Sequence, residues 1–396
     1  MGRRSNLVVS GVADLAAPVF RFRLVDFSRG IAALIVAAVH WKRFMVEYPW
    51  GTYSAGGLIE PLARHLGPLY EYGPLAVQFF WLISGFIFAH VYGATKIGFL
   101  GFAGRRIARL IPLHLLTLFM VAALQIGFVL LIGTTLFYTA DAYHFVLNLL
   151  FIPSFGLESG LSFNGPIWSV AVELPIYAFF WLTVARLRLN AVIALGISAV
   201  FFLLQDVTTF TQVDYCGLMF FVGSAIYYAS EWFKPALLAI LAAAGWAIGI
   251  AAALLMPWVG EAITLVTVIA FGPVLALLGA ADRILGERPG IWDRFAAFGD
   301  LSYSIYLLHV PLIMAITMAM ILLGIDRGIL SGNVAAMVVF LVATVAISHI
   351  SLKSFENPAR HWLRTKFASG PDRGRRNLRL PGTAPPRRGQ PKPGDV

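Results

Sequence analysis

The chain has 396 residues, of which 59% are hydrophobic and only 13% are charged. A soluble domain usually carries roughly 25% charged residues, so too little polar surface is present here to cover a water-soluble globule. The single cysteine, Cys216, excludes an intramolecular disulfide. The composition therefore excludes an ordinary soluble domain and favours an integral membrane protein.

The hydrophobic residues form successive runs of about 20 residues, the length of helix that crosses a hydrocarbon core of about 30 Å. We therefore predict an all-α, polytopic membrane protein with about ten transmembrane helices in one bundle. The run at 142–152 is too short to cross and is expected at the membrane interface. The predicted spans are 27–46, 74–92, 106–132, 165–185, 190–204, 215–231, 235–254, 259–280, 300–323 and 333–355.

The positive charges give an independent test of this topology. If the N-terminus is cytoplasmic, the predicted cytoplasmic segments hold 26 of the 30 Lys and Arg residues. The predicted outer segments hold only Lys42, Arg43, Arg64 and Arg327. This bias is the positive-inside pattern of membrane proteins. It predicts an even number of spans, with both termini in the cytoplasm.

Three segments follow along the chain: a basic cytoplasmic N-terminus at 1–26, a membrane domain at 27–364 and a basic cytoplasmic tail at 365–396. No small-residue cleavage site follows the first apolar run, which is expected to be a retained span and not a signal peptide. Pro, Gly and Arg dominate the tail, which is expected to be disordered. The tail is expected to be attracted to anionic lipid, and no folded platform accompanies it that would predict a nucleic-acid partner.

Five polar side chains on five different spans are predicted to lie at a similar depth. An ionisable group at mid-depth costs at least about 2.5–3.5 kcal/mol on insertion scales. A rise of about 1.5 Å per residue places His40, Ser84, Glu173 and His309 roughly 13–16 Å from a membrane boundary, with His114 at a similar depth. Such groups are satisfied only by facing one another inside the bundle or a wet cavity. The residue types favour His40 as a general base and Glu173 as its partner.

Structural explanations compete with this interpretation. For His114, a hydrogen bond between helices is as good an explanation as a catalytic role, and Ser84, followed by Gly85, is equally explained by close helix packing. His40 and Glu173 are harder to explain in this way, because Trp41, Lys42 and Arg43 crowd the span just beyond His40 and a lone buried carboxylate is costly.

A basic cluster lies at the predicted inner surface, in the segment GRRIARLIP. Arg105, Arg106 and Arg109 lie on successive turns at the start of a span. Such arginines are often topological anchors that extend toward the interface, and they equally form good phosphate-binding sites. The sequence leaves both explanations open.

Six short segments, in order over about 330 residues, carry a resemblance to a known family. Arg29 and His40 are separated by ten residues in the first of them. The segments are VDFSRGIAALIVAAVH (25–40), QFFWLISGF (78–86), RRIARLIP (105–112), PIWSVAVELPIY (166–177), LSYSIYLLHVP (301–311) and FENPARHW (355–362). Together they resemble the acyltransferase-3 family of membrane acyltransferases. Leu174 and Pro175 depart from the family pattern, which commonly has an acidic residue and Gln there, and Pro175 is expected to kink the span.

The resemblance implies that residues 27–364 form an acyltransferase-3-like domain in a bacterial inner membrane. It implies transfer of an acyl group, usually acetyl from acetyl-CoA, to a hydroxyl of a glycan or another extracytoplasmic acceptor. No bound cofactor is expected beyond the acyl-CoA substrate, and no metal-ligand spacing is present in the sequence.

The resemblance and the chemistry of acyl transfer together give each candidate residue a role. His40 is expected to act as the base, and Glu173 to fix its tautomer and balance its charge. Arg105, Arg106 and Arg109 are expected to hold the phosphates of cytoplasmic acyl-CoA, and Arg29 to link this cluster to the reacting groups. The candidates for positioning the acceptor or stabilising the oxyanion are Ser84, Trp168, Tyr303 and His309.

A second functional class is a proton-coupled secondary transporter of a small solute, because buried His and Glu residues also suit a proton relay. Transporters of this kind commonly show inverted repeats with interrupted helices. The sequence shows no such symmetry, so an acyltransferase is favoured.

Overall fold

The computed structural model describes residues 20–368, apart from 46–58, 96, 154, 159, 206, 256–262 and 287–289. The predicted features of residues 1–19, of residues 46–58 and of the tail from residue 369 therefore lie outside the described residues. The described part is predominantly helical and also contains an isolated β-bridge between Thr139 and Ser162.

A helix occupies each predicted apolar span, and several shorter helices lie between them. The elements are α1 Arg23–Val39, η1 His40–Met45, α2 Ala63–Tyr72, η2 Gly73–Leu75, α3 Ala76–Tyr92, α4 Phe99–Ile132, α5 Ala142–Leu149, α6 Ile167–Leu187, α7 Ala191–Leu204, α8 Thr211–Trp232, α9 Pro235–Leu255, α11 Ile263–Leu285, α12 Ile291–Asp300, α13 Ser302–Leu322, η3 Arg327–Leu330, α14 Val334–Ser351, η4 Leu352–Glu356 and α15 Asn357–Ala368.

The predicted number of about ten membrane spans is not confirmed. Seven helices in the described part of the chain are long and apolar enough to cross a membrane. The helices α7, α8 and α9 coincide with predicted spans but are not among these seven; α7 and residues Pro235–Gly249 of α9 are apolar but shorter. The seven are Arg23–Met45, Ala63–Tyr92, Phe99–Ile132, Ile167–Leu187, Thr267–Leu285, Ser302–Leu322 and Val334–Lys366.

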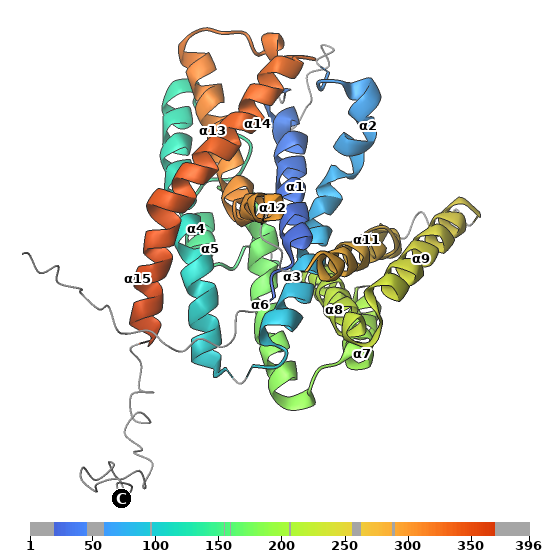
Figure 1. Ribbon diagram of the computed structural model, residues 1–396. Coiled ribbons are helices and arrows are strands. Elements are labelled where there is room, and N and C mark those ends of the chain that lie inside the picture. Colours follow the sequence, from blue (N-terminus) through green and yellow to red (C-terminus); the bar gives the residue numbers. More distant parts are fainter. Residues whose placement is uncertain are drawn as a thin grey trace, which may run out of the picture.

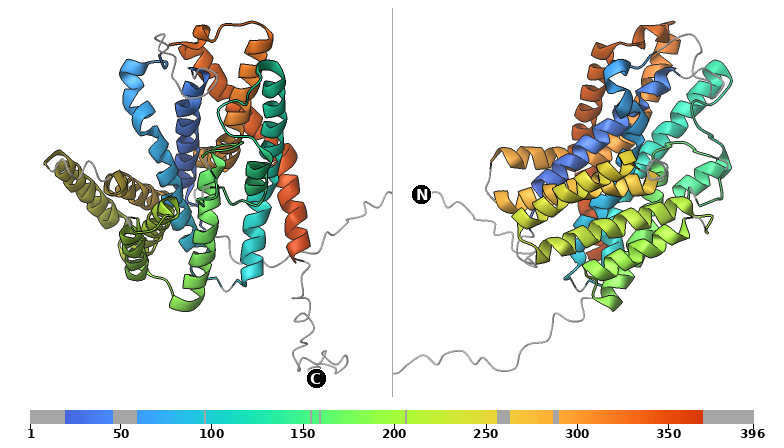
Figure 2. Two further views of the ribbon diagram at one scale, coloured as in Figure 1. Left: turned by 180° about the vertical axis from the view of Figure 1, so that it is seen from behind. Right: turned by 90° about the vertical axis from the view of Figure 1, so that its right-hand side faces the viewer.

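The helices form a central bundle with a group of helices on one side (Figure 1). The central helices are α1, α3, α4, α6 and α13, and the continuous run of α14, η4 and α15 lies along one flank. On the opposite flank, α8 packs against α3 and α7, and α9 packs against α11. The view from behind shows the same division, with α9 and α11 extending away from the bundle (Figure 2).

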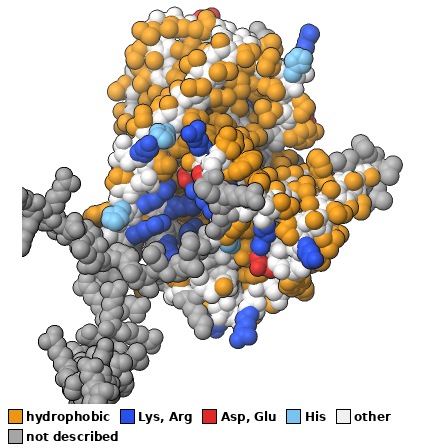
Figure 3. Space-filling view, viewed as in Figure 1, with side chains coloured by type: hydrophobic (Ala, Val, Ile, Leu, Met, Phe, Trp, Pro, Cys, Tyr) orange, Lys and Arg blue, Asp and Glu red, His pale blue; other side chains and the backbone are white. Residues whose placement is uncertain are grey.

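Large apolar side chains cover much of the outer surface. Leu130, Leu203, Ile240, Val339 and Ile350 are each more than 60% exposed. Hydrophobic atoms dominate the face seen in Figure 3, where Lys and Arg side chains gather at a hollow beside α15 and α12. A soluble monomer rarely exposes apolar patches of such extent, so this surface is that of an integral membrane protein in contact with lipid.

Two glycines allow α3 and α8 to pack backbone against backbone. A Cβ atom at Gly85 would overlap the carbonyl oxygen of Phe220, and one at Gly223 would overlap the carbonyl oxygen of Leu82. Small residues commonly permit this close approach between membrane helices. The contact places Ser84, the neighbour of Gly85, beside the centre of the bundle.

Gly85→Ala is expected to lower the free energy of unfolding by about 1–3 kcal/mol, because the added methyl group overpacks the α3–α8 contact. The measurement is the thermal unfolding midpoint in detergent. Gly196→Ala on α7 is the control, since nothing lies within 4 Å of its added Cβ. Equal unfolding midpoints for Gly85→Ala and the unmodified protein would show that the contact is not this tight.

Candidate active site

The interior of the bundle contains two neighbouring cavities. The first, which we call the arginine cavity, has a volume of about 100 Å³ and is lined by Arg29, Phe80, Trp81, Ile83, Ser84, Ile87, Phe88, Arg106, Arg109, Leu110, Ser169, Val170, Glu173, Tyr177, Ser302, Tyr303 and Tyr306. The second, which we call the histidine cavity, has a volume of about 230 Å³ and is lined by Val36, Val39, His40, Lys42, Arg43, Pro74, Val77, Tyr138, Leu161, Gly165, Pro166, Trp168 and Tyr306. Tyr306 lines both.

The two cavities follow one another along the helix axes. Arg29 on α1 and His40 directly after α1 line different cavities, and the step of eleven positions from one to the other corresponds to about 16 Å of helix. On α13, Tyr303 lines the arginine cavity, and His309 lies beside His40 of the histidine cavity. In the predicted topology, the arginine cavity is therefore nearer the cytoplasm.

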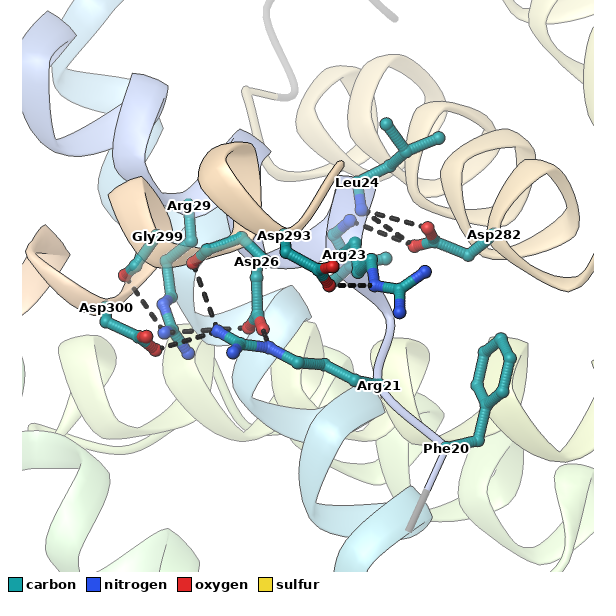
Figure 4. Close-up of polar contacts among 12 residues, drawn as sticks. Phe20, Arg21, Arg23, Leu24, Asp26, Arg29, Asp282, Asp293, Gly299 and Asp300 are labelled. Atoms are coloured by element: carbon teal, nitrogen blue, oxygen red, sulfur yellow. Dashed lines mark hydrogen bonds and ion pairs between the residues drawn. The ribbon is translucent and has the colours of Figure 1, made fainter. Parts of the chain in front are cut away.

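Arg29 is held in place by α12 and α13. Its side chain is only 13% exposed. The guanidinium donates hydrogen bonds to Ser302 Oγ at 2.9 Å and to the Gly299 carbonyl oxygen at 3.0 Å, and it lies 3.6 Å from a carboxylate oxygen of Asp26. Figure 4 shows the contacts of Arg29 with Gly299 and Asp26, and it also shows Arg21, which pairs with Asp26 and with Asp300. These contacts fix one positive charge at the edge of the arginine cavity.

The arginines of α4 have different environments. Arg106 donates to the Tyr92 hydroxyl at 2.8 Å, and its guanidinium lies 4.7 Å from the centre of the Phe88 ring. Arg109 lines the same cavity and forms no hydrogen bond or ion pair with any described residue. Arg105 is exposed and lines neither cavity, so the structure does not bring it to the predicted phosphate site. Because α4 begins at Phe99, these residues lie within the helix and not at its first turn.

Glu173 lies in the arginine cavity and not beside His40. Its carboxylate accepts hydrogen bonds from Ser84 Oγ at 3.3 Å and from the Tyr177 hydroxyl one turn later on α6. Among the described residues, no hydrogen bond joins Glu173 to His40. The predicted direct pair is therefore wrong. Counting residues estimates depth along a span, but it does not give the direction in which each side chain points.

His40 lies where α1 changes to the 3₁₀ helix η1. Its Nδ1 is 2.8 Å from the carbonyl oxygen of Val36, and the Nδ1 of His309 is 3.1 Å from the carbonyl oxygen of Ile305. A carbonyl oxygen only accepts hydrogen bonds, so neutral rings carry the proton on Nδ1 and leave Nε2 as an acceptor. The two ring centroids are 4.8 Å apart. The structure thus brings His40 together with His309.

His309 is fully buried, and its Nε2 has no hydrogen-bond partner among the described residues. A buried polar atom without a partner costs about 1–3 kcal/mol. Trp168 lines the histidine cavity together with His40. Its indole packs edge to face against that of Trp81, with 5.8 Å between the ring centroids. The cavity therefore combines the imidazole of His40 with an aromatic side chain, and the ring of His309 lies directly beside His40.

Tyr306 separates the two cavities. Its hydroxyl is 2.7 Å from Ser169 Oγ, and its ring contacts Phe80 on one side and His309 on the other. A group that passes from the arginine cavity to the histidines must therefore move past the Tyr306 side chain.

Two other predicted residues have structural partners. Tyr303 lines the arginine cavity, but its hydroxyl donates to the Leu110 carbonyl oxygen at 2.7 Å and joins α13 to α4. His114 lies in neither cavity, and its Nε2 is 2.9 Å from the carbonyl oxygen of Asn148. For His114, the structure supports the helix-packing explanation.

Sequence reasoning missed several polar residues that shape the site. Tyr177 and Tyr306 could have been found as tyrosines one turn from Glu173 and from the Ser302–Tyr303 pair, respectively. Glu356 is 1% exposed and accepts hydrogen bonds from Ser304, Ser351 and Arg360. The π-helical turn η4, a feature that is frequent at functional sites, ends at Glu356. Glu356 belongs to the segment FENPARHW, which the sequence analysis used only for the family resemblance.

These features define a polytopic membrane protein with a buried polar site inside its helix bundle. The chain belongs to the acyltransferase-3 family, because the model of that acyltransferase domain matches residues 23–352. The chain is also similar to "Protein 2 in picA locus" of Rhizobium radiobacter, with 32% identity over 202 residues that cover 46% of this chain and 94% of that protein. No solved structure matches the chain. The predicted family is thereby confirmed, and the protein is a membrane acyltransferase.

Proposed function

We propose that this acyltransferase moves an acyl group, in the first instance acetyl, from cytoplasmic acyl-CoA to a hydroxyl of a cell-surface polysaccharide or oligosaccharide. The proposal places the protein in a bacterial inner membrane with both termini in the cytoplasm. The observation that carries it is the succession of two cavities that share Tyr306, with arginines lining one and His40, whose ring contacts His309, lining the other.

The arginine cavity is proposed to hold the phosphates of the acyl-CoA donor. Arg109 has no described anionic partner, and Arg29 and Arg106 are held beside it by protein contacts. Guanidinium groups bind phosphate oxygens through charge-assisted hydrogen bonds. Glu173, hydrogen-bonded to Ser84 and Tyr177, offsets part of this positive charge. The thioester end of the donor then extends past Tyr306 toward His40.

His40 is proposed to act as the general base. Its Nε2 removes the proton from the acceptor hydroxyl, whose oxygen forms a bond to the thioester carbonyl carbon. The carbon–sulfur bond breaks, and the CoA thiolate takes the proton from His40 as it leaves. The Val36 carbonyl oxygen, and not Glu173, holds the tautomer that this step requires. His309 Nε2 is proposed to accept a hydrogen bond from a second acceptor hydroxyl and so to position the acceptor.

The proposal is tested by mass spectrometry of surface glycans from cells with and without the gene for this chain. We expect glycans from the complemented strain to be heavier by acetyl groups that mild alkali removes, because base cleaves esters. Identical glycan masses in the two strains would contradict a glycan acceptor. A mass difference that corresponds to succinyl would support the proposed acyl transfer and would identify the donor as succinyl-CoA instead of acetyl-CoA.

A further inference from the structure

We infer that the acceptor is an anionic carbohydrate, and that Lys42 and Arg43 bind its negative charge while His40 acts on its hydroxyl. This inference rests on the proposed function and specifies the substrate class of the same site. It starts from the histidine cavity, whose described lining residues include two cations and no carboxylate.

The local backbone directs His40 and Arg43 into one cavity. Both belong to η1, in which residues three apart lie on the same side because a 3₁₀ helix has three residues per turn. Trp41, on another side of η1, is 1% exposed and packs into the core. An α-helix continuing from α1 would rotate Arg43 away from His40 by about 60°. The change of helix type therefore places a cation next to the proposed base.

No described carboxylate forms an ion pair with either of the two cations. The Nε of Arg43 is buried without a hydrogen-bond partner among the described residues. Lys42 and Arg43 are partly buried, and charges that are removed from water are normally paired. The N-terminus of α6 adds positive potential, because Pro166 and Trp168 also line this cavity. An anion bound here would supply the missing partner.

Arg43 also joins the histidine cavity to the surface. A more open cavity of about 430 Å³, lined by Arg43, Phe137, Tyr138, Thr139, Gly160 and Leu161, shares Arg43, Tyr138 and Leu161 with the histidine cavity. The guanidinium lies over Tyr138, 5.0 Å from the ring centre. This stacking fixes the plane of the guanidinium and leaves its edge available for hydrogen bonds.

The arrangement fits a chain of sugars better than a small alcohol. The sugar that is acylated occupies the histidine cavity, where Trp168 presents an aromatic face. The next sugars extend past Arg43 into the more open cavity. A carboxylate or phosphate on one of these sugars accepts bidentate hydrogen bonds from the Arg43 guanidinium, and Lys42 adds a second positive charge.

The test uses the full-length protein in a neutral detergent, with radiolabelled acetyl-CoA and three soluble acceptors of equal length. One is a hexasaccharide of alternating glucose and glucuronic acid, the second is the same hexasaccharide with its carboxylates reduced to alcohols, and the third carries phosphate esters in place of the carboxylates. We expect kcat/KM for at least one anionic acceptor to exceed that for the neutral acceptor by about tenfold or more. Whichever of the two anionic acceptors has the higher kcat/KM identifies the recognised anion as carboxylate or phosphate.

Arg43→Gln and Lys42→Gln are expected to remove this preference by raising KM for the anionic acceptor, with a much smaller effect on the neutral one. Arg64→Gln is the control, because Arg64 is exposed on α2 and lines neither cavity. Size-exclusion profiles establish that each variant is folded. If Arg43→Gln does not fold, Lys42→Gln alone tests the preference for the anionic acceptor.

Equal rates for neutral and anionic acceptors with the unmodified protein would overturn the inference and leave the acyltransferase proposal standing. The inference would also be overturned if Arg43→Gln and Lys42→Gln each lowered kcat/KM equally for anionic and neutral acceptors. That result would show that the two residues have a structural role. If no acceptor were acetylated and no acetyl-CoA consumed, the proposed function would fall together with the inference.

Discussion

His40→Ala is expected to lower the rate of acyl transfer by about 10²–10⁴-fold, the usual contribution of a general base. The alcohol oxygen is a weak nucleophile until its proton is removed, and His40 Nε2 is the free acceptor at the point where the histidine cavity adjoins Tyr306. The Val36 carbonyl already occupies Nδ1 and keeps Nε2 in the accepting form. The measurement is radiolabel transfer from acetyl-CoA to glycan, under saturating donor and acceptor.

Binding and catalysis must be separated in this experiment. The arginine cavity does not include His40, so the affinity of His40→Ala for acetyl-CoA is expected to equal that of the unmodified protein. His349→Ala is the matched control, because His349 is exposed on α14 and lines neither the arginine cavity nor the histidine cavity. Full activity of His40→Ala would show that another group removes the proton. His309, whose ring lies against His40, would then be the candidate.

Much of the fold was predictable because hydrophobic length and charge bias act on whole segments. Each predicted span coincides with a helix, and the only large discrepancy concerns which of these helices cross the membrane. A helix such as α7 satisfies its backbone internally and packs against α8 whether or not it spans the bilayer. Apolar content alone therefore does not distinguish a crossing helix from one that is partly inserted.

The candidate site was predicted less completely, for a geometric reason. Depth estimates from helix rise placed His40, Ser84, Glu173 and His309 in one layer. In the structure, His40 lies beside His309, whereas Ser84 and Glu173 lie together in the arginine cavity. The predicted pairing of His40 with Glu173 is wrong, since the rotation of α6 about its axis turns Glu173 toward Ser84 and the α4 arginines. Rotation depends on which neighbouring helices pack closely. The neighbours of α6 include α3 and α8, and Gly85 and Gly223 set how these two helices pack against each other. The sequence does not identify the partner of either glycine on the facing helix.

The arginines of α4 allow the proposed donor site to be tested with neighbouring residues on one helix. Arg109→Gln is expected to raise KM for acetyl-CoA by about 10- to 100-fold, because a charge-assisted hydrogen bond to phosphate contributes about 1.5–3 kcal/mol. The variant should fold normally, since Arg109 makes no hydrogen bond or ion pair with the described protein groups. Arg106 is less suitable, because its contacts with Tyr92 and Phe88 also support α3.

Arg105→Gln is the matched control, because it removes the same charge from the same helix at an exposed position outside both cavities. We expect its KM for acetyl-CoA to stay close to that of the unmodified protein. A donor lacking the 3′-phosphate separates the effect of charge from general damage: if Arg109 binds that phosphate, the variant and the unmodified protein should use this donor equally well. If Arg105→Gln and Arg109→Gln raised KM alike, the arginines would act through the overall potential of the surface, and a defined phosphate site in the arginine cavity would be excluded.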